Sequence, residues 1–313
     1  MLTALDAPPK PSDPLFWTDF VELRALVHPD RCYSRGDLLG LLSRAKDTDG
    51  DGRRSRDGGS ESGEARWRDI AHFAEGRAHQ FAGAYPFRIS VDGDTLELLE
   101  ATSLNQNAYL CLLLSSLMRH VPKQRQGELA RFFEKASHTV FRRLMPEGAE
   151  VHPTWAGGGE GVRYRETLYE KMQAISKDIR CTANFTERDF KENDRGDGGI
   201  DLVAWHPMAD QREGIPAAFA QCGCSKEDWS FKQLEASPTK HSRHLPAMHP
   251  WATYYFMPLD LRHADGDWAY KSDIGQAIIV DRLRLIRLSH QYGLFSEWPH
   301  LPLIDEVRKT EYA

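Results

Sequence analysis

The 313-residue sequence predicts a soluble α/β protein with a mainly helical N-terminal region. Two observations predict this class. Apolar residues recur at helical spacing over residues 66–81, 107–120 and 128–145, which is typical of amphipathic or buried helices. Short apolar runs bounded by glycine and proline then follow at residues 200–205 and 217–224, which is typical of strands. We therefore expect two parts, residues 1–125 and residues 126–313.

Composition excludes several classes of protein. Hydrophobic residues make up 41% and charged residues 27% of the chain, and no apolar run approaches the roughly 18 residues that span a membrane. The five cysteines are odd in number and scattered, so a disulfide framework is not expected. The N-terminus shows no basic segment followed by an apolar one, so we expect a cytoplasmic protein. The net charge of −6 leaves room for a local basic groove that binds nucleic acid.

The N-terminal region is expected to contain helices, one hairpin and one loop. Residues 47–64 (DTDGDGRRSRDGGSESGE) are too polar to bury apolar surface, and we expect a flexible loop there. Residues 85–98 read as a β-hairpin around an Asp-Gly turn. Residues 107–120 are hydrophobic on nearly all sides, which predicts a helix buried at the centre of this region.

The C-terminal region is expected to alternate helices and strands. Its first helix covers residues 128–145, and a first strand follows near residues 149–152. A second helix covers residues 165–179. After the apolar runs at 200–205 and 217–224, further strands are expected at 251–261 and 275–280, with Asp281 capping a last helix.

Asp201 is the anomaly of the first apolar run, Ile200 to Trp205. A carboxylate in the middle of an apolar strand costs several kcal/mol to bury unless it is paired, hydrogen-bonded or bound to a metal. Side chains alternate along a strand, so Asp201, Val203 and Trp205 are expected to share a face. If the second run pairs with Gln221 on that same face, a carboxylate and an amide oxygen come within reach of one Mg²⁺ ion.

These residues resemble the core of the PD-(D/E)xK nucleases, the restriction-endonuclease-like superfamily, in the branch in which glutamine replaces the second acidic residue. The resemblance covers roughly residues 128–290 and implies a restriction-endonuclease-like core with a central mixed β-sheet flanked by helices. It implies that Asp201 binds the metal, while Gln221 contributes a side-chain or neighbouring backbone oxygen. Glu134 follows Phe133 as in the Phe-Glu pair that opens the first core helix of such proteins, where the glutamate points at the metal. Glu166 and Asp197 are lower-ranked acids.

The sequence departs from the superfamily pattern at Gly223, which stands where a lysine that positions the attacking water is expected. Two lysines follow in the segment Cys224 to Lys232. This segment resembles C-x-x-G-x-x-W-x-x-K sequences of related nuclease-like proteins, in which a lysine of the following helix serves instead. We rank Lys232 ahead of Lys226, because Lys232 shares a helix face with Trp229.

The predicted function is a Mg²⁺- or Mn²⁺-dependent deoxyribonuclease acting in restriction or antiphage defence. One alternative is a catalytically inactive DNA-binding or assembly subunit that keeps the fold. Another is a generic α/β protein in which backbone amides alone satisfy Asp201, without an acidic cluster. The chain has no P-loop, so an ATP-driven step would need a separate ATPase, helicase or sensor subunit. DNA is the expected partner, a homo-oligomer is an option, and no membrane is expected.

Overall fold

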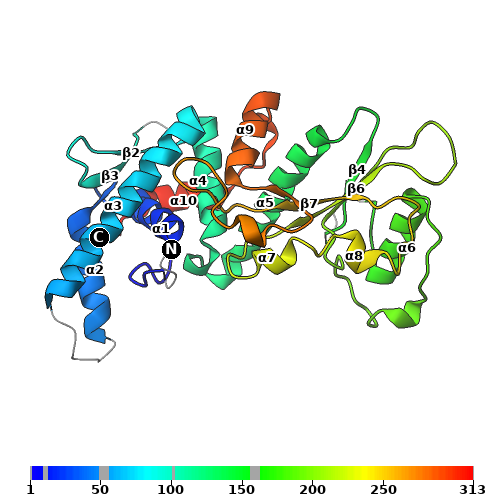
Figure 1. Cartoon of the computed structure of the whole chain (residues 1–313), viewed down its shortest axis with the longest axis horizontal. Helices are drawn as coiled ribbons and strands as arrows, with labels where there is room; N and C mark the ends of the chain where they lie inside the picture. Colours follow the sequence, from blue (N-terminus) through cyan, green and yellow to red (C-terminus); the bar gives the residue numbers. More distant parts are fainter. Residues whose placement is uncertain (1, 10–12, 49–55, 101–102, 156–162, 313) are drawn as a thin grey trace. The chain divides into compact units, whose positions relative to one another are not determined.

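The computed structural model describes residues 2–9, 13–48, 56–100, 103–155 and 163–312, and it is a mixed α/β protein (Figure 1). Contacts divide the chain into two compact units. Unit 1 contains residues 1–132, 259–270 and 282–313, and unit 2 contains residues 133–258 and 271–281. The sequence led us to expect a single boundary between residues 125 and 126, whereas the first division falls inside a helix and unit 1 also includes two later segments.

Unit 1 is mainly helical, with one small sheet. In this sheet β3 lies between β1 and β2 and is antiparallel to both, and the expected hairpin is thereby confirmed. Its elements are α1 (Pro14–Val27), β1 (Cys32–Ser34), α2 (Arg35–Thr48), α3 (Arg56–Phe81), η1 (Ala82–Ala84), β2 (Phe87–Ile89), β3 (Thr95–Leu98), α4 (Leu104–Ser116), η2 (Met118–His120), α9 (Arg282–Tyr292), η5 (Phe295–Glu297) and α10 (Pro302–Lys309). Among the described residues, none of the helices combines the length and the apolar composition that a membrane crossing requires.

Helix α4 is the apolar centre of unit 1, as its sequence predicts. Ser103 and Gln106 form a capping box that fixes its start, since each side chain accepts a hydrogen bond from the other's backbone N–H. Leu110, Leu112 and Leu113 are fully buried. Because residues on every side of the helix are buried, its sequence shows little amphipathic pattern.

The segment 47–64 differs from the expected loop. Helix α2 ends at Thr48, and residues 56–64 form the first turns of α3, so they are helical rather than irregular. Residues 49–55 lie outside the described residues. Helix α3 is anchored further along by the buried Trp67 and Ile70, and once a helix is nucleated each added residue gains a hydrogen bond. Propagation from this anchored part accounts for a helical start that the local composition disfavours.

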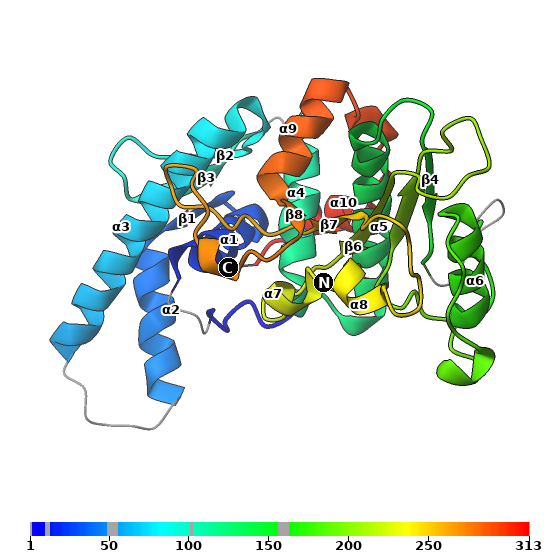
Figure 2. The same cartoon turned by 45° about the vertical axis from the view of Figure 1, so that its right-hand side comes forward.

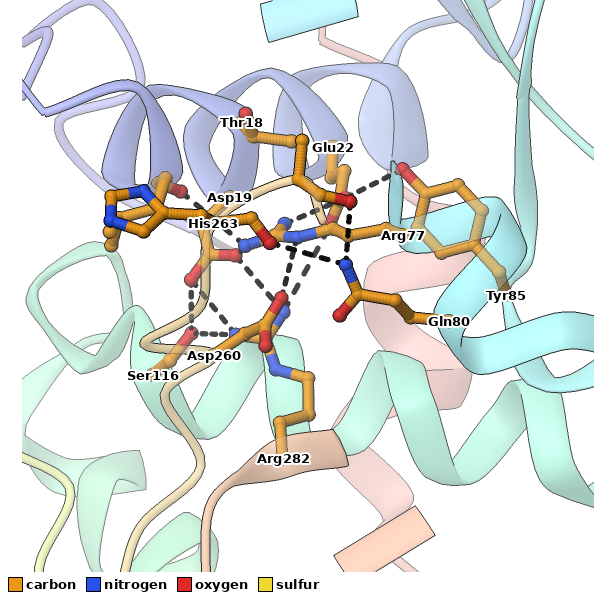
Figure 3. A network of polar contacts seen from close by, with 12 residues as sticks. Thr18, Asp19, Glu22, Arg77, Gln80, Tyr85, Ser116, Asp260, His263 and Arg282 are labelled. Atoms are coloured by element: carbon orange, nitrogen blue, oxygen red, sulfur yellow. Dashed lines mark hydrogen bonds and ion pairs between the residues drawn. The ribbon is translucent and has the colours of Figure 1, made fainter. Parts of the chain in front are cut away.

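A network of buried charges ties the elements of unit 1 together (Figure 3). Arg77 of α3 donates to Glu22 Oε1 at 2.8 Å and to Asp260 Oδ2 at 2.9 Å. Arg282 of α9 donates through both terminal nitrogens to the two oxygens of Asp19, at 3.0 and 2.8 Å. All five side chains are nearly or completely buried. The network therefore fixes residues 259–270 and the start of α9 to α1 and α3, although they are far apart in sequence.

Unit 2 is built around a five-stranded mixed sheet with the strand order β4-β5-β6-β7-β8. Strands β4, β5 and β6 are antiparallel, and β6, β7 and β8 are parallel. Its elements are the C-terminal part of α5 (Lys123–Leu144), β4 (Glu150–Pro153), α6 (Leu168–Asp178), η3 (Glu187–Asp189), β5 (Leu202–Trp205), β6 (Ala217–Cys222), α7 (Trp229–Lys232), α8 (Pro238–His241), β7 (Ala252–Phe256), η4 (Lys271–Asp273) and β8 (Ile278–Val280). Every strand expected from the sequence in this region is present.

Helices cover both faces of this sheet. On one face Phe141 of α5 makes edge-to-face contacts with Tyr254 and Phe256 of β7. On the other face Met172 and Ile175 of α6 share a hydrophobic cluster with strands β5 and β6. Figure 2 shows the strands of the sheet between α5 and α6. The two layers bury the strands, so any polar side chain within them needs a specific reason to be there.

Candidate active site

The site begins at a glycine-rich turn that leads into β5. Gly198 and Gly199 have φ of +67° and +87°, the left-handed region that glycine tolerates best. The Gly199 N–H donates to Asp197 Oδ1 at 2.7 Å, which holds this carboxylate over the turn. A Cβ at position 199 would lie 2.9 Å from both Lys240 Nζ and Glu235 Cβ. Glycine is therefore required here both by the backbone and by the segment that packs against the turn.

A β-bulge at the start of β5 sets the direction of Asp201. Leu202 pairs with Ala220, yet the N–H of Asp201 also donates to the Ala220 carbonyl, at 2.8 Å. Two residues of one strand thus face one residue of the other, which is the pattern of a bulge. Ile200, rather than Asp201, packs in the hydrophobic cluster with Val203 and Trp205. A bulge re-aims side chains, and such bulges are common beside active sites.

The bulge changes the geometry that strict alternation predicts. Gln221 follows the alternation of Phe219, which lies in the hydrophobic cluster, whereas the bulge interrupts the alternation between Asp201 and Val203. The shared face on which we based the pairing of Asp201 with Gln221 is therefore not what the structure has. The Oε1 atom of Gln221 is nevertheless buried without a hydrogen-bond partner among the described residues, which is unusual for a buried polar atom.

The Asp201 carboxylate is buried among other acids. Only 3% of the residue is exposed, and its Oδ2 accepts a hydrogen bond from the Cys222 N–H at 2.6 Å. Burial raises the pKa of Asp201 well above its usual range, and the charges of Asp197 and Glu134 raise it further. The Cys222 N–H lowers it but does not outweigh them. Besides one backbone amide, Asp201 therefore has two acids in its surroundings, a hydrogen-bonded Asp197 and the charge of Glu134.

Glu134 lies in α5, and its charge acts on Asp201. Its charge raises the pKa values of Asp201 and of the two buried thiols of Cys222 and Cys224, for which burial is the largest cause. Lys232, at the end of α7, lowers the pKa of Cys224, whereas Glu134 raises it. Glu134, Asp201 and Lys232 thus influence the same end of β6.

Lys232 and Lys226 differ in their surroundings. Trp229 is buried, as expected, and the short helix α7 places Lys232 at its C-terminal end. Lys226 forms an ion pair with Glu227 at 3.8 Å, and its side chain is 12% exposed. Neither lysine is among the principal groups that shift the pKa of Asp201.

Glu166 is separate from these groups. It is exposed, it has a φ of +70°, and it lies in the loop before α6, which starts at Leu168 rather than at residue 165. The helix starts later than expected because the capping box between Thr167 and Glu170 fixes its first turn. Glu166 is not among the principal groups that shift the pKa of Asp201.

Gly223 has a physical reason to be glycine. A Cβ at this position would lie 2.1 Å from the Tyr255 hydroxyl oxygen, so a lysine cannot occupy the position while Tyr255 stays in place. Tyr255 pairs with Gln221 in the parallel register of β6 and β7. Its hydroxyl is buried without a hydrogen-bond partner among the described residues, and burial raises its pKa. The aromatic ring thus fills the space of the missing lysine.

Sequence reasoning missed Lys171 of α6. Its Nζ donates to the backbone carbonyls of Thr154, Arg195 and Gly196, at 3.0, 3.1 and 3.0 Å. Burial lowers the pKa of Lys171, and the charge of Asp197 opposes this. The lysine therefore anchors the loop that carries Asp197. In the sequence it looks like an ordinary helix-surface lysine between Glu170 and Met172.

Within the described ranges, no three His, Cys, Asp or Glu side chains are grouped closely enough to hold a metal ion by themselves. Mg²⁺ often needs fewer protein ligands, because it keeps several waters and is held by one or two carboxylates together with substrate phosphates. Comparison of the chain with protein families, curated protein sequences and solved structures found no match.

Proposed function

We propose that the chain is a divalent-metal-dependent endonuclease that hydrolyses DNA phosphodiester bonds. The observation that carries the proposal is the buried Asp201 carboxylate, whose pKa is raised by burial and by the neighbouring acids Asp197 and Glu134. A divalent cation would relieve the repulsion among these carboxylates and compensate their burial. Perturbed carboxylates of this kind cluster at functional sites.

The residues present fit Mg²⁺ or Mn²⁺. Asp201 and Asp197 would hold the ion. Gln221 ranks below them as a ligand, because its unpaired Oε1 belongs to a side chain on the face of Phe219 and not on that of Asp201. When bound, the ion supplies Lewis-acid activation of the phosphate and lowers the pKa of a coordinated water. Glu134 adds negative charge to the same site. Lys232 would orient the attacking water and stabilise charge on the phosphate.

The arrangement of strands and helices in unit 2 also supports this proposal. Unit 2 has a central mixed sheet with helices on both faces, which agrees with the restriction-endonuclease-like core that the sequence resemblance implies. We extend the proposal to a cytoplasmic role in restriction or antiphage defence. DNA is the substrate, a separate ATPase, helicase or sensor subunit would supply any energy-driven step, and a homo-oligomer is compatible with it.

A second function has one specific observation in its favour. Tyr255 fills the space that the catalytic-strand lysine would need at position 223. A chain that has lost this lysine and kept its fold would be a catalytically inactive DNA-binding or assembly subunit. The two functions differ in whether Lys232 replaces the missing amine.

Cleavage assays on supercoiled, linear and single-stranded DNA separate the two functions. With Mg²⁺ or Mn²⁺ the wild-type chain is expected to cut at least one substrate, and EDTA should abolish the activity. Asp201→Ala and Lys232→Ala should each lower the rate by about 100-fold or more. Lys226→Ala is the matched control and should retain most activity. DNA binding without cleavage under every condition would establish the inactive subunit instead.

A further inference from the structure

A pocket of about 620 Å³ lies beside the candidate site in unit 2. It is formed by α7, the connection to α8, α8 itself and the loop before β8, and it is open to solvent. The residues that matter for its chemistry are Phe231, Leu234, Glu235, Ser237, Lys240 and Gln276.

The pocket adjoins the glycine-rich turn. Glu235 and Lys240 line it, and the same two residues pack against Gly199, whose Cβ would lie 2.9 Å from atoms of both. Gly199 is two residues from Asp197 and two from Asp201 in the sequence. A ligand in the pocket would therefore lie next to the acids of the proposed metal site.

The pocket combines an exposed aromatic ring with a buried hydroxyl that lacks a hydrogen-bond partner among the described residues. Phe231 is 79% exposed and Leu234 is 39% exposed, so both apolar side chains are accessible to a ligand. Ser237 is 2% exposed, and its hydroxyl has no hydrogen-bond partner among the described residues. Gln276 also lines the pocket and contributes an amide. An aromatic platform with amide and hydroxyl groups suits a flat heterocyclic base.

Lys240 supplies a charge of the right sign for a phosphate. It is exposed, and no ion pair of Lys240 is found in the part of the chain that the structure describes. Its amine lies at the boundary between the pocket and the turn that carries Asp197. A base in the pocket would thus have its own phosphate at Lys240 and the neighbouring phosphate towards the acids.

We propose that this pocket holds one unpaired nucleotide of the DNA substrate, with the base stacked on Phe231 and its phosphate on Lys240. This inference rests on the proposed function and names the form of DNA that the site takes. Duplex DNA keeps its bases stacked and paired, so it would have to release a base before the pocket could be filled. The chain should therefore prefer single-stranded or locally unpaired DNA.

The test measures binding of a fluorescein-labelled 12-nucleotide oligothymidylate by anisotropy, with the wild-type chain in EDTA so that cleavage cannot occur. Phe231→Ala should weaken binding about 5- to 150-fold, the equivalent of the roughly 1–3 kcal/mol of one base stacked on an aromatic ring. Phe231→Trp should restore it. Met208→Ala, which removes another exposed apolar side chain of unit 2, should leave affinity unchanged.

Salt dependence tests the phosphate contact separately. Lys240→Ala should reduce the slope of log K against log salt concentration by about 0.7, the value of one phosphate contact to a single strand. Lys177→Ala, which removes an exposed lysine of α6, should leave the slope unchanged. A blunt duplex of the same length should bind more weakly than the single strand.

The outcomes separate this inference from the proposed function. Single-strand binding that depends on Phe231 and Lys240, without cleavage under any condition, would support the pocket and overturn the nuclease. Metal-dependent cleavage with unchanged oligonucleotide affinity in Phe231→Ala would do the reverse. Equal affinity for single strand and duplex, or no binding of either, would also overturn the pocket.

Discussion

Both units bury carboxylates, but the neighbouring charges lower the pKa of Asp19 in unit 1 and raise the pKa of Asp201 in unit 2. In unit 1 burial alone would raise the pKa of Asp19, but Arg282 and Arg77 outweigh it and the pKa is lowered. In unit 2 burial raises the pKa of Asp201, and the nearby charges of Asp197 and Glu134 add to the increase. The arginines of unit 1 neutralise the buried carboxylates and join the elements that carry them. In unit 2 no such cation stabilises the charged form of Asp201 among the principal groups that act on it, so a bound metal ion would stabilise that form.

The comparison also explains why Asp201, rather than Glu22, is the candidate metal ligand. Glu22 accepts hydrogen bonds from Arg77, Tyr85 and Tyr109, so its lone pairs are occupied by protein donors. Asp201 accepts a hydrogen bond from the Cys222 N–H and shares another with the acid Asp197, and neither partner carries a positive charge. A fully hydrogen-bonded carboxylate has little capacity left for a ligand, and a partly satisfied one retains it.

Removing an arginine that neutralises the buried carboxylates of unit 1 should have the largest effect on stability. Arg77→Met removes the guanidinium that neutralises the buried Glu22 and Asp260, which should cost about 3–5 kcal/mol of unfolding free energy. Urea unfolding followed by circular dichroism measures the change. Arg88→Met is the matched control, because the Arg88–Glu97 pair is exposed and should contribute less than about 1 kcal/mol. Similar losses in the two variants would show that the buried network is not a structural tie.

Removing the anchor of the Asp197 loop should have the next largest effect. Lys171→Met leaves three backbone carbonyls without their charged donor and should cost about 1.5–3 kcal/mol. DNA cleavage should fall as well, because Asp197 would lose its fixed position. Lys177→Met, on an exposed site of the same helix, should change neither quantity. Full activity in Lys171→Met would mean that the position of this loop is unimportant.

Asp201→Asn should increase the stability of the metal-free protein at neutral pH, whereas the two preceding substitutions decrease stability. The folded-state pKa of Asp201 is raised, so the stability linked to its neutral form is present below the unfolded-state pKa and is lost as pH rises through the folded-state value. In metal-free buffer the asparagine variant should therefore match wild type near pH 4 and become more stable at higher pH. Each kcal/mol corresponds to a rise of about 2–4 °C in Tm. A pH-independent difference in Tm, measured by thermal unfolding, would argue against a raised pKa.

The smallest effect is expected for Glu166→Gln. This acid is exposed in the loop before α6 and is not among the principal groups that shift the pKa of Asp201. Cleavage rate and Tm should both stay within the error of wild type. A large loss of activity would return Glu166 to the site and weaken the case for Glu134.

Most of the fold could be predicted because apolar periodicity is a local signal. The strand near residues 149–152, the two strands around the β5–β6 connection and the buried helix α4 all follow from spacing of apolar residues. The reassignment of residues 259–270 and 282–313 to unit 1 could not be predicted. It depends on contacts such as Arg282 with Asp19, which are 263 residues apart and leave no local pattern.

The candidate site was predictable in its acids but not in its geometry. Asp201 stands out because a carboxylate is unexpected in an apolar strand, and Glu134 stands out through the residue before it. The bulge that re-aims Asp201 adds one residue to one strand, which alternation cannot reveal. The role of Lys171 depends on a turn that follows 24 residues later, so its sequence context contains no sign of it.

Titration calorimetry with Mn²⁺ tests the central claim, that the uncompensated acids of unit 2 bind a divalent cation through Asp201. Wild-type protein should bind Mn²⁺ near pH 7 and release protons, since a metal displaces the proton that the raised pKa retains. Repeating the titration in two buffers of different ionisation enthalpy counts those protons. Asp201→Asn, which keeps the size and the hydrogen-bond acceptor, should neither bind at this site nor release protons. Equal binding and equal proton release in the two proteins would contradict the account.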